Sequence, residues 1–201
     1  MDKTLHFRSA ACHRPLLAGM AWLLLLTSVM GKDLPKFRPH VLANDLKAGY
    51  QLIVTDLTGD GKKDLIAIDE FASEVPWFEN RHPAWKRRVL ARDVPRPLNA
   101  DCLDIDGDRL PEVVLTYHFD PSPQRGIGNL IVLKRGSDLD QPWTAHEFDR
   151  LPTAHRIRWI DPQGSGDPLL AVAPIVGKQS PPAADDPAPI YRGSLRKPQR
   201  G

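Results

Sequence analysis

The chain has 201 residues, 41% of them hydrophobic, with 27 lysines and arginines against 25 aspartates and glutamates. The formal net charge is therefore only +2 and no basic face is clustered, so a nucleic-acid partner has no support. Cys12 falls in the export segment predicted below, which leaves Cys102 alone and excludes an internal disulfide.

Residues 1–31 are predicted to be an export signal. A basic beginning precedes 15 uncharged residues, Leu16 to Met30, and Val29 and Gly31 are small enough for a cleavage site. The apolar stretch is shorter than the roughly 20 residues that span a bilayer comfortably. We therefore expect a secreted or periplasmic protein, and membrane attachment only if the signal stays uncleaved.

An acidic loop follows the first predicted strand, residues 51–55, and leads into an apolar run, residues 65–68. Residues 56–64 read DLTGDGKKD, with carboxylates at positions 1, 5 and 9. Oxygen donors at alternate positions on a glycine-bent backbone suit a hard cation such as calcium. The alternative is that aspartate and glycine simply make a good turn. The predicted ligands are Asp56, Asp60, Asp64, the hydroxyl or carbonyl of Thr58, and the carbonyl of Lys62.

A second acidic loop begins 48 residues after the first and also stands between two predicted strands, residues 99–103 and 113–116. Residues 104–112 read DIDGDRLPE, and Arg109 stands where the first loop has a glycine. That position often needs a positive φ, which costs a non-glycine residue roughly 1 kcal/mol. The predicted ligands are Asp104, Asp106, Asp108, the carbonyl of Leu110, and Glu112.

A third copy of the loop is predicted at residues 161–167, between strands at residues 156–160 and 169–173. It keeps the turn but has no carboxylate at positions 5 and 9, so we expect it to hold no metal. Between the loops, Trp85 and Trp143 are expected to pack rather than to bind a ligand. From residue 178 to residue 201, prolines mixed with charges predict an unpacked tail, which leaves residues 32–177 as the folded domain.

The repeated loops resemble the FG-GAP/VCBS family, whose repeats carry D-x-[DN]-x-D-G-x-x-[DE] between two strands. Thr58 at position 3 and Arg109 at position 6 depart from that pattern. The resemblance implies an all-β fold of β-propeller blades whose loops hold structural calcium. Residues 32–177 are long enough for about three blades, whereas a closed ring needs at least four. We therefore expect an incomplete ring whose open blade edges invite self-association.

A closer resemblance rests on HRIRW at residues 155–159 and VAPIVG at residues 172–177. These segments are similar to the propeller domain of aldos-2-ulose dehydratases, and the similarity covers roughly residues 40–192. It implies that His155, Arg156 and Arg158 converge with His118 or Tyr117 toward the propeller axis. There they would supply acid–base groups and a cationic anchor. A catalytic divalent metal on such a histidine is conceivable, but nothing further in the sequence supports one.

These patterns predict a secreted, calcium-assisted propeller module that binds a carbohydrate or protein ligand or serves as a scaffold. The alternative is a propeller fragment of a sugar-converting enzyme, a carbon–oxygen lyase that is inactive alone or completed by another chain.

Overall fold

The computed structural model describes residues 36–122, 125–162, 164, 166 and 168–175, and the backbone of residues 191–193. The chain divides into two compact units, Met1–Val41 and Leu42–Gly201, and all features below belong to the second. The predicted export signal lies outside the described residues. Within them, no helix is long and apolar enough to cross a membrane.

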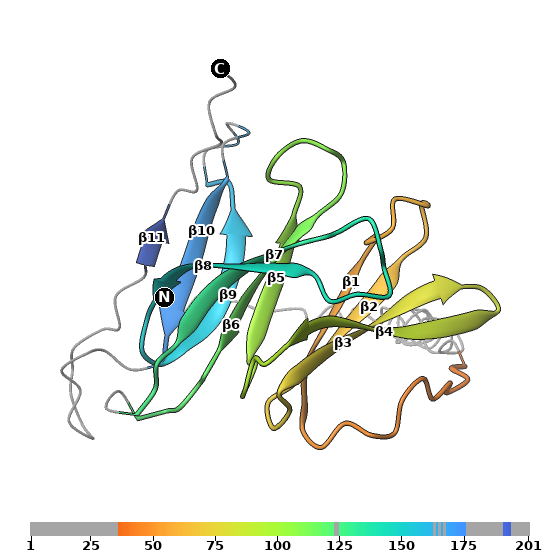
Figure 1. Cartoon of the computed structure of the whole chain (residues 1–201), viewed down its shortest axis with the longest axis horizontal. Coiled ribbons are helices and arrows are strands. Elements are labelled where there is room, and N and C mark those ends of the chain that lie inside the picture. Colours follow the sequence, from red (N-terminus) through yellow and green to blue (C-terminus); the bar gives the residue numbers. More distant parts are fainter. Residues whose placement is uncertain are drawn as a thin grey trace, which may run out of the picture. The chain divides into compact units, whose positions relative to one another are not determined.

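The described chain is all-β, as the sequence predicts, and its eleven strands form three antiparallel sheets (Figure 1). The first sheet contains, in order, β1 (Gly49–Thr55), β2 (Asp64–Asp69), β3 (Glu74–Arg81) and β4 (Ala84–Arg92). The second contains β5 (Asn99–Leu103), β6 (Glu112–Tyr117), β7 (Asn129–Lys134) and β8 (Thr144–Arg150). The third contains β9 (Ala154–Ile160), β10 (Leu169–Pro174) and β11 (Tyr191–Gly193).

Within each sheet, every strand pairs with the next strand in the chain, because short connections favour antiparallel neighbours. The three predicted loops occupy the same place in each sheet, between its first and second strands. β11 comes from the segment predicted to be an unpacked tail, and it pairs with the edge of β10. An edge strand presents unpaired backbone groups that an extended segment can satisfy. The rest of that tail, residues 178–190 and 194–201, lies outside the described residues.

Two hydrophobic clusters join the three sheets. The second sheet contributes to both, because successive side chains of a strand point to opposite faces: Val113 belongs to one cluster and Val114 to the other. The middle sheet is thus buried on both faces. Trp143 is buried in the first cluster, which confirms its predicted packing role, and Trp85 is half-buried. The second cluster comprises Val114, Leu130, Ala154, Ile157, Leu170 and Val172.

The first strands of the sheets repeat one burial pattern with a single exception. Ala100 in β5 and Ile157 in β9 both lie four residues before the first aspartate of the following loop, and both are 0% exposed. The corresponding residue of β1, Leu52, is 61% exposed, and Val54 beside it is 58% exposed. The preceding sheet covers this face in β5 and β9. No described sheet covers it in β1, so the outer face of the first sheet is open at β1, whereas Ala67 and Phe78 on the same face are buried.

Side chains connect the first strands where no backbone ladder joins the sheets. The Gln51 side chain accepts a hydrogen bond from the Ala100 backbone N–H (2.8 Å) and donates one to the Ala100 carbonyl (2.9 Å). Asn99 repeats this role one sheet later, because its Oδ1 accepts from the backbone N–H of Ile157 (2.9 Å). Gln51 and Asn99 both lie five residues before the first aspartate of their loops. They therefore hold the first strands of the three sheets side by side.

Candidate functional site

The two acidic loops have the same backbone conformation. In each, the first aspartate accepts backbone hydrogen bonds from the residues at positions 4 and 6, and both donors have positive φ. In the first loop Asp56 accepts from Gly59 (2.7 Å) and Gly61 (2.8 Å), with φ of 79° and 83°. In the second loop Asp104 accepts from Gly107 (2.6 Å) and Arg109 (2.9 Å), with φ of 85° and 75°. The expectation that Arg109 takes a positive φ is confirmed.

The third loop folds in the same way in its described part. Asp161 accepts a hydrogen bond from the Gly166 backbone N–H (2.8 Å), and Gly164 and Gly166 have φ of 62° and 74°. The predicted turn is therefore present. Residues 163, 165 and 167 lie outside the described part of the chain.

The carboxylate at position 9 fastens each acidic loop to its own sheet. Asp64 accepts the backbone N–H groups of Leu57 (2.9 Å) and Asn80 (2.8 Å), and Glu112 accepts that of Ile105 (2.9 Å). Burial raises the pKa of the Asp64 carboxyl above its ordinary value, and these hydrogen bonds offset the rise only in part. Asp64 and Glu112 therefore have a structural role in the loops.

The three carboxylates of Asp104, Asp106 and Asp108 can bring one oxygen each to within 4.8 Å of one another, and all three are exposed. The carboxylates of the first loop form no such group within the described residues. There the Asp60 carboxylate pairs with Lys62 (3.1 Å), and position 3 is Thr58, whose hydroxyl donates to Asp56 (3.4 Å). The donor set of the second loop therefore fits a hard cation better than that of the first.

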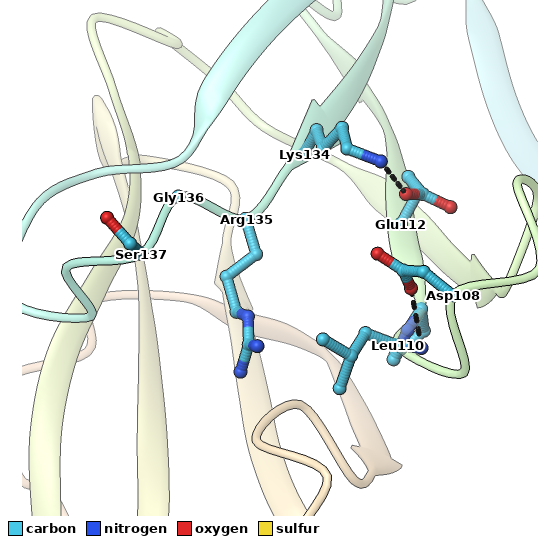
Figure 2. A pocket seen from close by; sticks show the side chains of 8 residues that line it. Asp108, Leu110, Glu112, Lys134, Arg135, Gly136 and Ser137 are labelled. Carbon is cyan, nitrogen blue, oxygen red and sulfur yellow. Dashed lines mark hydrogen bonds and ion pairs between the residues drawn. The ribbon is translucent and has the colours of Figure 1, made fainter.

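Lys134 provides the charge beside the second loop. Its ammonium forms ion pairs with Asp106 and with Glu112 (3.1 Å), and these raise the pKa of Lys134 above its ordinary value. Figure 2 shows Lys134 reaching Glu112; both residues line a pocket, as does Arg135. Arg135 donates hydrogen bonds to the carbonyls of Leu57 (3.3 Å) and Thr58 (3.2 Å), which ties the second sheet to the first acidic loop.

A second polar group forms at the starts of β1 and β9. The Tyr50 hydroxyl lies 2.7 Å from Nε2 of His155 and accepts a hydrogen bond from Nη1 of Arg156 (2.9 Å). The Phe119 ring lies 5.7 Å from the imidazole, and the Arg156 guanidinium lies over the Tyr50 ring at 5.1 Å. Three polar groups that can bond a ligand therefore meet beside two aromatic rings.

The charge on the imidazole in this group depends on the pKa of His155. Burial, reinforced by the charge of Arg156, lowers the pKa of His155, so the imidazole is neutral at pH 7. A guanidinium can only donate, so the Tyr50 oxygen accepts from Arg156. The Tyr50 hydroxyl and Nε2 of His155 share one hydrogen bond, whose direction depends on the imidazole tautomer.

Arg158 is held close to this group but by other partners. Its Nη1 donates to Oδ1 of Asn99 (3.0 Å) and to the carbonyls of Ala100 (3.2 Å) and Ile157 (2.6 Å). His118 and Tyr117 form a separate group. Their rings stack at 4.9 Å, and Nδ1 of His118 bonds Oδ1 of Asn129 (2.8 Å). Of the residues expected to converge, His155 and Arg156 meet at the Tyr50 hydroxyl. Arg158 is held by Asn99 instead, and His118 and Tyr117 do not join them.

Sequence reasoning missed Tyr50 and Asn99. Tyr50 and His155 are 105 residues apart in the chain, yet each lies six residues before the first aspartate of its loop. Aligning the three repeats on that aspartate would have revealed the shared position. Asn99 would have appeared in the same alignment, one residue further on, beside Gln51.

Comparisons of this chain with protein-family models and with curated proteins found no match.

Proposed function

We propose that the chain forms three blades of a β-propeller of the FG-GAP/VCBS type and works outside the cytoplasm as a carbohydrate-binding module. The repeated four-stranded meander supports the blades, as does the recurrence of one loop between the first two strands of each sheet. The location rests on the predicted export signal.

The observation that carries the binding function is the hydrogen-bonded chain from Arg156 through Tyr50 to His155. It combines a cation, a hydroxyl and a neutral imidazole, which together can donate to and accept from sugar hydroxyls. The Tyr50 and Phe119 rings pack against the imidazole, and Phe119 is only 7% exposed, so these rings hold the polar groups in place. A few placed polar groups beside apolar side chains are typical of small-molecule sites. The same tyrosine–imidazole pair could transfer a proton, which favours the sugar-converting enzyme as the second candidate.

Titration calorimetry with glucose and with fructose, a keto-sugar, tests the binding function on the purified chain. We expect His155→Ala to weaken binding about tenfold or more, because hydrogen bonds to a ligand hydroxyl are lost. His146→Ala is the matched control, since His146 is exposed on β8 and forms no hydrogen bond with Tyr50, His155 or Arg156 in the described structure. Absence of binding to either sugar would contradict the proposal. Ultraviolet absorbance of an enone product in the same mixtures, abolished by His155→Ala, would instead favour the enzyme.

We propose further that calcium binds the second acidic loop through Asp104, Asp106 and Asp108, supported by the convergence of their carboxylates. A ligand that binds only the folded state at ten times its Kd adds about 1.4 kcal/mol, which corresponds to a rise of about 3–6 °C in Tm. Millimolar calcium should therefore raise the Tm of the wild-type chain, measured by scanning calorimetry.

Two variants compare the loops in the same experiment. Asp106→Ala should abolish the calcium-dependent rise in Tm, whereas Asp60→Ala should retain most of it, because the converging carboxylates are those of the second loop. The difference in Tm with and without calcium is the readout, so any general loss of stability cancels. A wild-type Tm that calcium leaves unchanged would remove calcium from the proposal.

We also propose that copies of the chain associate through the open face of the first sheet, which contains Leu52 and Val54. The equivalent positions of the second and third sheets are covered by a neighbouring sheet, and large apolar side chains on an uncovered sheet face favour association.

A further inference from the structure

Arg156 and Arg158 present two positive charges on one side of β9. They are two residues apart in a strand, so both side chains leave the same face, and both residues are exposed. Most guanidinium groups of this fold have an acidic partner, such as Arg88 with Glu79 (2.7 Å) and Arg96 with Glu70 (2.8 Å). Among the described residues, neither Arg156 nor Arg158 has a carboxylate within 4.0 Å.

Asp101 of the neighbouring strand β5 forms no ion pair with either arginine. Asp101 in β5 accepts the backbone N–H of Trp159 (2.8 Å) through Oδ2 and that of Cys102 (3.0 Å) through Oδ1. Its carboxylate therefore holds β5 against β9. The imidazole of His155 and the hydroxyl of Tyr50 carry no opposing charge either. Glu70, whose charge acts on His155, forms an ion pair with Arg96 (2.8 Å). Arg156 and Arg158 are therefore left without an ion-pair partner in this part of β9.

Both guanidinium groups are positioned, and each is held by a single nitrogen. Nη1 of Arg156 donates to the Tyr50 hydroxyl, and Nη1 of Arg158 donates to Asn99 Oδ1 and to two carbonyls. The Nε and Nη2 donors of both side chains have no acceptor in the described structure. That edge of a guanidinium binds a carboxylate through two parallel hydrogen bonds. Because Nη1 already holds each side chain in place, binding a carboxylate would cost less conformational entropy.

We propose that the ligand of the Tyr50–His155–Arg156 site is an acidic sugar, whose carboxylate binds Arg156 and Arg158. The inference rests on the proposed carbohydrate-binding function and adds the charge of the ligand to it. The sugar hydroxyls meet His155 and Tyr50, while the carboxylate takes the unused guanidinium edges. A neutral sugar can bind His155 and Tyr50 through its hydroxyls, but it leaves the charges of Arg156 and Arg158 without an anionic partner.

Calorimetry on the full chain with glucuronate, glucose, acetate and inorganic phosphate tests this assignment. We expect glucuronate to bind about tenfold or more tightly than glucose, because charge-assisted hydrogen bonds are roughly twice as strong as neutral ones. Added salt should weaken glucuronate binding and leave glucose binding unchanged. Acetate and phosphate should bind more weakly than glucuronate, since they lack the ring that contacts His155.

Variants separate the carboxylate contact from the sugar contact. Arg156→Gln and Arg158→Gln should each remove the preference for glucuronate over glucose. Arg92→Gln, an exposed arginine on β4, should leave that preference unchanged. Arg158→Lys keeps the positive charge but cannot form the two parallel hydrogen bonds of a guanidinium, so it should retain part of the preference for glucuronate over glucose. This variant takes the place of Arg158→Gln if Arg158→Gln does not fold.

The outcomes distinguish this inference from the function on which it rests. Equal affinity for glucuronate and glucose, both lost in His155→Ala, would overturn the acidic-sugar assignment and keep the carbohydrate function. Acetate or phosphate binding as tightly as glucuronate would show a general anion site and overturn both. Failure of all four compounds to bind would also overturn both.

Discussion

Replacing Trp77 by alanine lowers the free energy of unfolding by about 3–5 kcal/mol, the range for removing a buried tryptophan from a core. Trp77 is 0% exposed and belongs to the cluster between the first and second sheets. The buried Arg88 guanidinium lies over its ring at 5.6 Å and bridges Glu79 and Asp140 (2.7 and 2.5 Å). Losing the ring would therefore also loosen an ion-pair network that joins the two sheets.

Urea denaturation followed by circular dichroism measures this change. Trp85→Ala is the control, because Trp85 lies on the same hairpin and is only half-buried; its loss should be clearly smaller. If Trp77→Ala cost less than about 1 kcal/mol, the first and second sheets would not share the core described here.

Replacing Asn99 by alanine is expected to cost about 2–4 kcal/mol of stability, because several buried groups lose partners worth about 1–3 kcal/mol each. Asn99 is 1% exposed, and its side chain contacts the other two first strands, β1 and β9. The Ile157 backbone N–H, Nη1 of Arg158 and Oε1 of Gln51 would each lose a hydrogen bond.

The same urea titration measures this loss, with Asn80→Ala as the control. Asn80 bonds Lys63 and His82 at the exposed end of the first sheet, where water can replace the lost contacts. Its loss should stay within about 1 kcal/mol. Equal losses in both variants would mean that Asn99 has no special role in joining the sheets.

The local part of the fold was predictable from the sequence. A strand predicted at residues 51–55 appears as β1, Gly49–Thr55, and the run at residues 65–68 appears as β2, Asp64–Asp69. Alternating apolar residues and aspartate–glycine turns are short-range signals, and the backbone follows them here. The positive φ of Arg109 was predictable for the same reason, because the loop pattern specifies it.

The arrangement of side chains was not predictable in the same way. The first acidic loop is closer to the family pattern at position 6, yet the carboxylates converge in the second loop. One local difference is that Asp106 stands where the first loop has Thr58, which gives the second loop a third carboxylate. Ion pairs do not separate the loops, because Asp60 pairs with Lys62 and Asp106 pairs with Lys134. A spacing pattern does not describe how such side chains are placed.

Contacts between distant parts of the chain were the hardest to predict. The Tyr50–His155 hydrogen bond depends on how three sheets stack, and each strand pattern reports only its own two faces. In the sequence, Tyr50 and His155 are related only by their position, six residues before the first aspartate of their loops. That relation becomes visible only when the three repeats are aligned.

The double-sided burial of the middle sheet makes the chain a series of three sheets in which each hydrophobic cluster joins only neighbours. Loss of an end member would leave one cluster and two sheets still packed together. Loss of the middle member would remove both clusters at once and separate Tyr50 from His155. Harmful sequence changes should therefore be concentrated in β5 to β8, while variation accumulates toward the two ends of the series.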